Sequence, residues 1–177
     1  SPDALRRLFA VKRRPIDHPV IVHLAGAEAL EFFVTEVPST ARALVDVFWP
    51  GPLTVVLRRS GRIPDEVTGG RDTVGLRVPD QPIARALLGA FGGAIAAPSA
   101  NRFGRVSPTT AADVRADLGD DVDLILDGGP CRIGVESTIV DCTGAAPAIL
   151  RLGGVAQEAI EDVVGACQTR GAGPLRG

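Results

Sequence analysis

Apolar residues along this chain follow two spacings, which predict a series of helices and strands. Leu5, Leu8 and Phe9 lie three or four residues apart after Ser1 and Pro2, which predicts a helix ending near residue 12. The same spacing predicts helices at residues 27–34, 38–48, 81–91, 108–118 and 156–164. Short apolar runs between turn residues predict strands at residues 20–24, 53–57, 73–78, 94–97, 123–126, 137–141 and 148–152. Residues 61–71 are expected to form a loop.

The order of these elements predicts the fold class. Strands alternate with helices in places but also occur as neighbouring pairs, so we expect an α+β fold with a mixed sheet covered by helices. We expect one domain over residues 1–166, because 177 residues suffice for one substantial core. Residues 167–177 are rich in Gly and Arg and are predicted to be a disordered tail or the start of a linker.

Composition and charge narrow the classes of function. A net charge of −2 creates no global attraction to nucleic acid or membranes, and no apolar run approaches the ~18 residues of a membrane span. Cys131, Cys142 and Cys167 are odd in number and widely spaced, which argues against a disulfide framework or zinc site and predicts a cytoplasmic protein. Because the chain has no methionine, we expect an N-terminal part of the translation product to be missing from it.

Familiar nucleotide-binding and hydrolytic motifs are absent from the sequence, which contains no GxxxxGKS/T, GxGxxG, HExxH or GxSxG pattern. A phosphorylated ligand would therefore be held by separate basic side chains. Lys12 is the only lysine, and Arg14 follows it just before Pro15, which makes a short cationic segment of restricted geometry. Such a segment is consistent either with a solvated surface or with an anion site.

Small polar residues follow the strand predicted at residues 94–97. Ser99 and Asn101 come first, and Ser107 and Pro108 then suit the N-cap and first position of a helix. We therefore expect Ser99 and Asn101 to lie in a crevice beyond the carboxyl end of a strand, beside a helix N-terminus that favours anions.

Polar residues within apolar strands allow two interpretations each. Arg77 and Arg151 either face solvent or grip a carboxylate with their forked guanidinium groups. His23 is either a satisfied core histidine or a ligand-binding residue, and Ser137 either pairs across strands or contributes to a site.

Taken in order, these motifs resemble a known family. The matching segments are residues 12–15, 18–23, 49–54, 75–79, 98–101, 107–109, 136–141 and 150–153. Over roughly residues 1–155, their order resembles the YrdC-like family of L-threonylcarbamoyladenylate synthases. The resemblance implies a three-layer fold, in which a twisted mixed sheet carries helices on both faces, with a large concave site.

The resemblance also implies an activity. Members are nucleotidyltransferases that make threonylcarbamoyl-AMP and pyrophosphate from L-threonine, bicarbonate and ATP, for the t6A modification of tRNA. A downstream threonylcarbamoyl transferase complex uses the product. Mg²⁺ would accompany ATP as part of the substrate, and no dedicated metal site is expected in the protein.

Site residues follow from the resemblance position by position. The family's catalytic Lys-x-Arg and Ser-x-Asn pairs match Lys12, Arg14, Ser99 and Asn101. The residues expected to hold ATP are Lys12, Arg14, His18, the backbone of Thr73, Asn101, Thr109 and Arg151. Those expected to hold L-threonine are His23, Arg77, Ser99 and Ser137, with Arg77 on the carboxylate.

Two departures from the family pattern affect these expectations. His18 stands where the family usually has Asn, and nothing here matches the family's first strand with its Thr-x-Tyr-Gly-type segment, so we expect an N-terminal strand to be missing. Two alternatives are a non-catalytic module that binds double-stranded RNA or tRNA, and a carbamoyl-transfer paralogue of the same fold. The slightly negative charge argues against the first, and the intact Lys-x-Arg and Ser-x-Asn pairs argue against the second.

Overall fold

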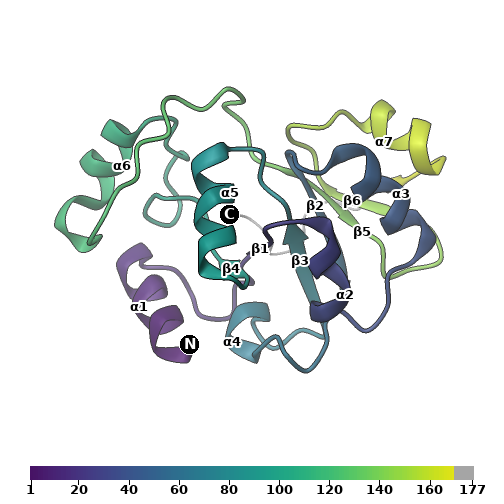
Figure 1. The fold of residues 1–177 in the computed structure, drawn as a ribbon, viewed down its shortest axis with the longest axis horizontal. Helices are drawn as coiled ribbons and strands as arrows, with labels where there is room; N and C mark the ends of the chain where they lie inside the picture. Colours follow the sequence, from purple (N-terminus) through teal and green to yellow (C-terminus); the bar gives the residue numbers. More distant parts are fainter. Residues whose placement is uncertain (170–177) are drawn as a thin grey trace.

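The computed structural model describes residues 1–169 and contains one mixed sheet with helices around it (Figure 1). Its strands are β1 (Val22–His23), β2 (Leu53–Arg58), β3 (Thr73–Arg77), β4 (Ile95–Ala96), β5 (Thr138–Asp141), β6 (Ala148–Arg151) and β7 (Gln168–Thr169). They lie in the order β4-β1-β3-β2-β5-β6-β7. The pairs β1/β3, β2/β5 and β6/β7 are parallel, and the other neighbours are antiparallel, so the predicted mixed sheet is confirmed.

The helices of the described residues largely follow the predicted spacing. They are α1 (Pro2–Lys12), η1 (Ala27–Ala29), α2 (Leu30–Phe33), α3 (Ser39–Phe48), α4 (Asp65–Thr68), α5 (Pro82–Phe91), α6 (Ala111–Leu118), η2 (Gly119–Asp121) and α7 (Gln157–Val164). The side chain of Ser1 caps α1, as predicted, and Gln81 caps α5. No helix in the described part of the chain is both long and apolar enough to cross a bilayer.

One row of side chains across the sheet forms the centre of the core. Val22, Leu76, Val55, Val140 and Ile149 occupy paired or neighbouring positions on adjacent strands, and all five are buried. The buried side chains of α3 and α7 join them in the same cluster. Because side chains alternate between the faces of a strand, His23, Arg77 and Ile139 point to the opposite face, where α5 lies. Helices therefore cover both faces, as the family resemblance implied.

The predicted start of the helix at residues 108–118 is wrong. α6 begins at Ala111, with Thr110 as its N-cap. The Thr110 hydroxyl accepts a hydrogen bond from the Asp113 backbone N–H, and the Asp113 carboxylate accepts one from the Thr110 N–H, which satisfies two helix-end donors at once. Ser107 is not a cap, because its hydroxyl donates to the carboxylate of Glu136 instead.

Two further predictions are wrong, both because a local pattern carries no information about neighbouring segments. Residues 123–126 form no strand, and Leu124 and Leu126 are 74% and 52% exposed. The expected loop at 61–71 contains the single helical turn α4, which follows Pro64 and ends at Gly69 with a φ of +60°.

The predicted disordered tail is wrong for its first residues. Gln168 and Thr169 form β7, which pairs in parallel with β6 along the edge of the sheet. This pairing gives hydrogen-bond partners to backbone N–H and C=O groups of β6, for which the sequence pattern predicted no partner strand. The rest of the predicted tail, residues 170–177, lies outside the described residues.

Candidate active site

A cavity of about 380 Å³ lies between α5 and the face of the sheet opposite α3 and α7. Its apolar walls include Leu87 and Leu88 of α5 together with Ile95 and Ile139 from the sheet. Its polar lining consists of Arg14, His23, Arg77, Ser99, Glu136, Ser137 and Arg151. Six of these seven residues are among those that the sequence analysis assigned to a site, so the fold brings together segments up to 137 residues apart.

A second cavity of about 370 Å³ adjoins the first and shares Arg77, Ser99 and Glu136 with it. The segment before α6, including Ser107 and Thr109, forms one wall, and residues 125–129 and 133–135 form another. The two cavities therefore form one bipartite site, with a cation, a hydroxyl and a carboxylate at their junction.

The pairing of β1 with β3 positions His23 beside Arg77. These two residues are register partners on parallel strands, so their side chains leave the sheet on the same face. Arg77 Nε donates to the Gly51 carbonyl oxygen at 2.9 Å, which fixes the guanidinium plane. Burial, and then the charge of Arg77, lowers the pKa of His23 to about 4. His23 is therefore neutral at neutral pH and able to form hydrogen bonds without adding charge.

Ser137 and Arg151 form a fixed unit at the neighbouring β5/β6 edge of the cavity. Arg151 Nη2 donates to both the carbonyl and hydroxyl oxygens of Ser137, at 3.0 and 3.1 Å, and the Ser137 hydroxyl lies 2.8 Å from Thr54 Oγ1. Gly153 permits this arrangement, because a Cβ there would lie 2.1 Å from the Glu136 carbonyl oxygen. On each side of the cavity, an arginine is therefore held by a hydrogen bond to a backbone carbonyl oxygen, which restricts the movement of its side chain.

Lys12 joins α1 to the segment that carries Ser99 and Asn101. α1 ends there because Arg13 adopts a left-handed φ of +52° and Pro15 follows. The Lys12 ammonium donates to the backbone carbonyl oxygens of Ser99 and Asn101, and the side chain is only 5% exposed. Burial, and then the charge of Arg14, lowers the pKa of Lys12 to about 8. Lys12 and Asn101 are therefore direct neighbours, as a shared site requires.

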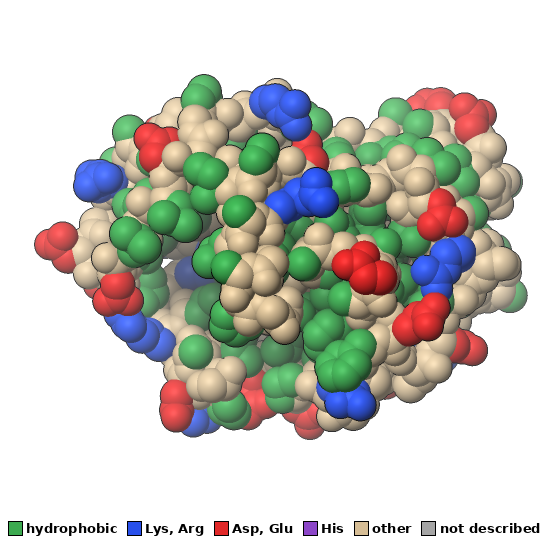
Figure 2. Space-filling view, in the orientation of Figure 1, with side chains coloured by type: hydrophobic (Ala, Val, Ile, Leu, Met, Phe, Trp, Pro, Cys, Tyr) green, Lys and Arg blue, Asp and Glu red, His purple; other side chains and the backbone are tan. Residues whose placement is uncertain are grey.

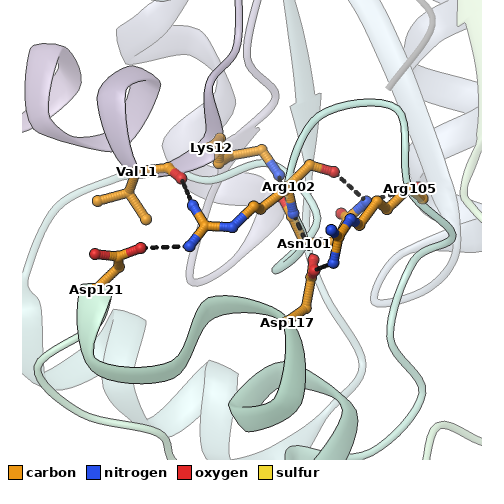
Figure 3. A network of polar contacts seen from close by, with 7 residues as sticks. All are labelled: Val11, Lys12, Asn101, Arg102, Arg105, Asp117 and Asp121. Atoms are coloured by element: carbon orange, nitrogen blue, oxygen red, sulfur yellow. Dashed lines mark hydrogen bonds and ion pairs between the residues drawn. The ribbon is translucent and has the colours of Figure 1, made fainter.

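Charged side chains lock the segment after Asn101 in place (Figure 3). Asn101 Nδ2 donates to the carbonyl oxygens of Arg102 and Arg105, at 3.0 and 2.7 Å. Arg102 reaches the Val11 carbonyl oxygen at 2.8 Å and the Asp121 carboxylate, while its backbone N–H donates to Asp117. The segment is thereby attached to both α1 and the end of α6.

No pattern in the sequence predicted a role for Phe103, yet its ring contacts two of the predicted site residues. Its backbone N–H donates to the Lys12 carbonyl oxygen at 2.8 Å. The Arg14 guanidinium lies 5.8 Å from the ring centroid, and the His18 ring meets it edge to face at 5.2 Å. Arg14 also donates to the Pro19 carbonyl oxygen at 2.8 Å, so its head group is fixed at the cavity wall.

Among residues 1–169, four unpartnered buried polar atoms lie in or near the candidate site, two of them on residues that line the first cavity. Within the described residues, the buried side-chain nitrogen or oxygen atoms without a hydrogen-bond partner belong to Arg14, His18, His23 and Asn101. The sequence analysis had assigned all four to ligand binding. Because an unmade buried hydrogen bond is costly, such atoms indicate a place where a ligand supplies the missing partners.

The structure does not bring every predicted residue to the two cavities. Thr109 lines the second cavity, whereas Lys12, His18 and Asn101 line neither. Lys12 contacts the backbone of Ser99 and Asn101, and His18 packs on the Phe103 ring that also meets Arg14. Thr73 stands apart, because it pairs with Arg58 at the opposite end of β3 from Arg77 and lines neither cavity.

The expected crevice beyond the carboxyl end of the strand at residues 94–97 holds for Ser99, which follows β4 and lines both cavities, whereas Asn101 lines neither. β4 runs antiparallel to β1, so Ser99 lies towards the start of β1 and the first cavity extends over the sheet face. Glu136 lines both cavities, and no role was predicted for it from the sequence. Its position next to Ser137 was the one signal that could have marked it.

Comparisons with known proteins identify relatives of this chain. A sequence profile of the Sua5/YciO/YrdC family, described as telomere recombination, matches residues 1–153. The chain is 47% identical over 163 residues to a threonylcarbamoyl-AMP synthase of Pyrococcus abyssi and 44% identical over 166 residues to one of Bacillus subtilis. These alignments cover 92% and 93% of this chain but 48% of each relative, so the chain spans about half of their length.

Solved structures give the same picture of the fold. Pyrococcus abyssi Sua5 complexed with L-threonine matches with a TM-score of 0.93 at 46% identity, covering 95% of this chain and 49% of that one. Escherichia coli YciO matches with a TM-score of 0.78 at 26% identity, covering 89% of this chain and 77% of that one.

Proposed function

Because this chain belongs to the Sua5/YciO/YrdC family, we propose that it carries the active site of a threonylcarbamoyl-AMP synthase. As a nucleotidyltransferase, it would join L-threonine, bicarbonate and ATP and release pyrophosphate. The observation that carries this proposal is the cavity where the guanidinium groups of Arg14, Arg77 and Arg151 meet the hydroxyls of Ser99 and Ser137. Such a lining suits an amino acid beside a polyphosphate, both of which present anionic oxygens.

The first cavity suits L-threonine, which is the ligand named for the Pyrococcus abyssi Sua5 structure. Arg77 keeps Nη1 and Nη2 for the substrate carboxylate while Nε holds Gly51. Neutral His23 and the hydroxyls of Ser99 and Ser137 would orient the amine and the side-chain hydroxyl. Leu87 and Leu88 of α5 limit the access of water to this end of the site.

The junction of the two cavities is where the reacting groups would meet. The threonine amine and bicarbonate would first form a carbamate with loss of one water molecule. A carbamate oxygen would then attack the α-phosphorus, the bond to the β-phosphate would break, and pyrophosphate would leave with that electron pair. Arg14 and Arg151, which line the first cavity, would neutralise charge on the leaving group, and Thr109, which lines the second, would contact the nucleotide. Lys12 adds charge and holds the carbonyls of Ser99 and Asn101, so it positions the Ser-x-Asn segment.

Mg²⁺ would enter with ATP as part of the substrate. No group of three or more His, Cys, Asp or Glu side chains within residues 1–169 could hold a metal ion. The one carboxylate shared by the two cavities belongs to Glu136. This donor set does not make a metal cage, so the triphosphate oxygens would supply most of the ligands of the ion.

The test is an assay of pyrophosphate release from ATP and bicarbonate, with and without L-threonine. We expect release to depend on L-threonine. Lys12→Ala should lower the rate by roughly one to two powers of ten, because it removes charge-assisted contacts worth about 1.5–3 kcal/mol. Arg42→Ala is the matched control, since Arg42 pairs with Glu31 outside the site and should stay near wild type. Release that does not depend on L-threonine would contradict the proposal.

The product would pass to a threonylcarbamoyl transferase complex that modifies tRNA. The non-catalytic RNA-binding alternative has weaker support, because acidic and basic side chains are interspersed on the face in Figure 2 and the net charge is −2. A steeply salt-dependent affinity for duplex RNA without ATP turnover would favour that alternative instead.

A further inference from the structure

Glu136 occupies the junction of the two cavities and has a carboxylate among cations. It is the one acidic residue in the lining of the first cavity, which also contains Arg14, Arg77 and Arg151. It lines the second cavity as well, together with Arg77. A carboxylate in this place repels every anionic ligand that the guanidinium groups attract.

Two contacts hold the Glu136 side chain in this position. Its Oε1 accepts a hydrogen bond from the Ser107 hydroxyl, and its Oε2 lies 3.8 Å from Arg151 Nη2. The backbone is fixed too, because the Glu136 carbonyl oxygen accepts a hydrogen bond from Gly154 N–H at 2.9 Å. The carboxylate is therefore anchored on the second-cavity side and offers its other oxygen to the cations.

Glu136 acts on several cations at once. Its charge raises the pKa of Lys12, Arg77 and Arg151, opposing the lowering that burial causes in each of them. It thus favours the charged forms of these side chains while cancelling part of their attraction for a ligand. These are the properties of a counter-ion. A side chain that bound the anionic ligand directly would need a positive charge.

We propose that Glu136 is a built-in counter-ion that competes with anionic ligands for the guanidinium groups of the cavity and so promotes the release of pyrophosphate. This inference rests on the proposed function, which supplies ATP and pyrophosphate as the anions. A site built from cations alone would hold its tetra-anionic product tightly and turn over slowly. Glu136 limits the affinity while leaving the directional hydrogen bonds in place.

The test is the affinity of Glu136→Gln for inorganic pyrophosphate and for ATP, measured by isothermal titration calorimetry. Gln has nearly the same shape but no charge, so we expect Kd for pyrophosphate to fall about tenfold, equivalent to about 1.4 kcal/mol. The gain should shrink at high salt, because it is electrostatic. In the turnover assay, Glu136→Gln should be inhibited by pyrophosphate at lower concentrations than wild type.

Two further variants separate charge from other effects. Glu136→Asp keeps the charge and should keep the weak pyrophosphate affinity to within about threefold. Asp72→Asn is the matched control, because Asp72 pairs with Arg58 at 2.6 Å beside the end of β3 opposite Arg77 and lines neither cavity. It should change the affinity by less than about twofold, since its side chain is 76% exposed and its charge is screened by solvent.

Equal or weaker pyrophosphate binding by Glu136→Gln would overturn the counter-ion role, and weaker binding would mean that Glu136 positions Arg151 instead. Failure of the proposed function has a different outcome. In that case the wild type would release no pyrophosphate with L-threonine, while the Glu136→Gln effect on pyrophosphate binding could still be measured. If no variant binds either anion, both the counter-ion role and the proposed function are wrong.

Discussion

The buried ammonium of Lys12 should make folding stability depend on pH in a way that one substitution removes. Burial and the neighbouring charge of Arg14 lower the pKa of Lys12 from 10.5 to about 8 in the folded protein. At about 1.4 kcal/mol for each unit of pKa, this fall corresponds to about 3 kcal/mol. Lys12→Met replaces the lysine with an unbranched apolar side chain of similar length, which has no proton to lose.

The sign of this pH dependence follows from the number of protons bound by the folded and the unfolded chain. Below about pH 8 the folded and unfolded chains both hold the Lys12 proton, so no pH dependence arises from this group. Between about pH 8 and the unfolded pKa of 10.5, the unfolded chain holds a proton that the folded chain has lost. The free energy of unfolding should therefore rise with pH in this window, by up to about 3 kcal/mol, in the wild type only.

Urea unfolding followed by circular dichroism, at steps from about pH 7 to about pH 10.5, measures this difference. Other groups that titrate there, such as Cys167, are common to both proteins and cancel when the variant is subtracted. The wild type should gain stability relative to Lys12→Met across the window. If the two stability curves run parallel throughout, the ammonium is not buried as the structure places it.

Three other predictions test separate parts of the structure. Because His23 has a pKa of about 4 in the fold, stability should fall by up to about 3 kcal/mol as pH drops from 6.5 towards 4, and His23→Gln should lose that dependence in urea titrations. Arg77→Lys keeps a charge but loses the forked donor, so KM for L-threonine should rise about tenfold while KM for ATP changes less than about threefold; an equal rise in both would argue against a threonine carboxylate at Arg77. Thr110→Ala should cost about 1 kcal/mol in thermal unfolding and Thr110→Ser much less, and equal melting temperatures would remove Thr110 from the cap of α6.

Local patterns predicted much of the secondary structure of the described residues. Helical spacing located α1, α3, α5 and α7 within one or two residues, because apolar positions three or four residues apart and nearby Ser, Pro and Gly residues mark each of them in the sequence. The start of α6 was misplaced because Ser107 and Thr110 both suit an N-cap, and only the acceptor near Ser107 distinguishes them. The run at residues 123–126 was misread because strands need a neighbour, which no local pattern shows.

The residue types and their order, and hence the family resemblance, can be read from the chain alone, including Lys12-x-Arg14, Arg77, Ser99-x-Asn101, Ser137 and Arg151. Which of these residues meet depends on the fold. Sheet register sets His23 beside Arg77 and leaves Thr73 at the opposite end of β3 from Arg77, although the family resemblance implied a site role for His23 and for the Thr73 backbone. The fold also places the Lys12 ammonium at the carbonyl oxygens of Ser99 and Asn101, and it places Glu136 among the guanidinium groups of the cavity. The physical reason is that electrostatic and hydrogen-bonding partners depend on distance in space, which is fixed by packing the sheet and its helices, while a sequence records only distance along the chain.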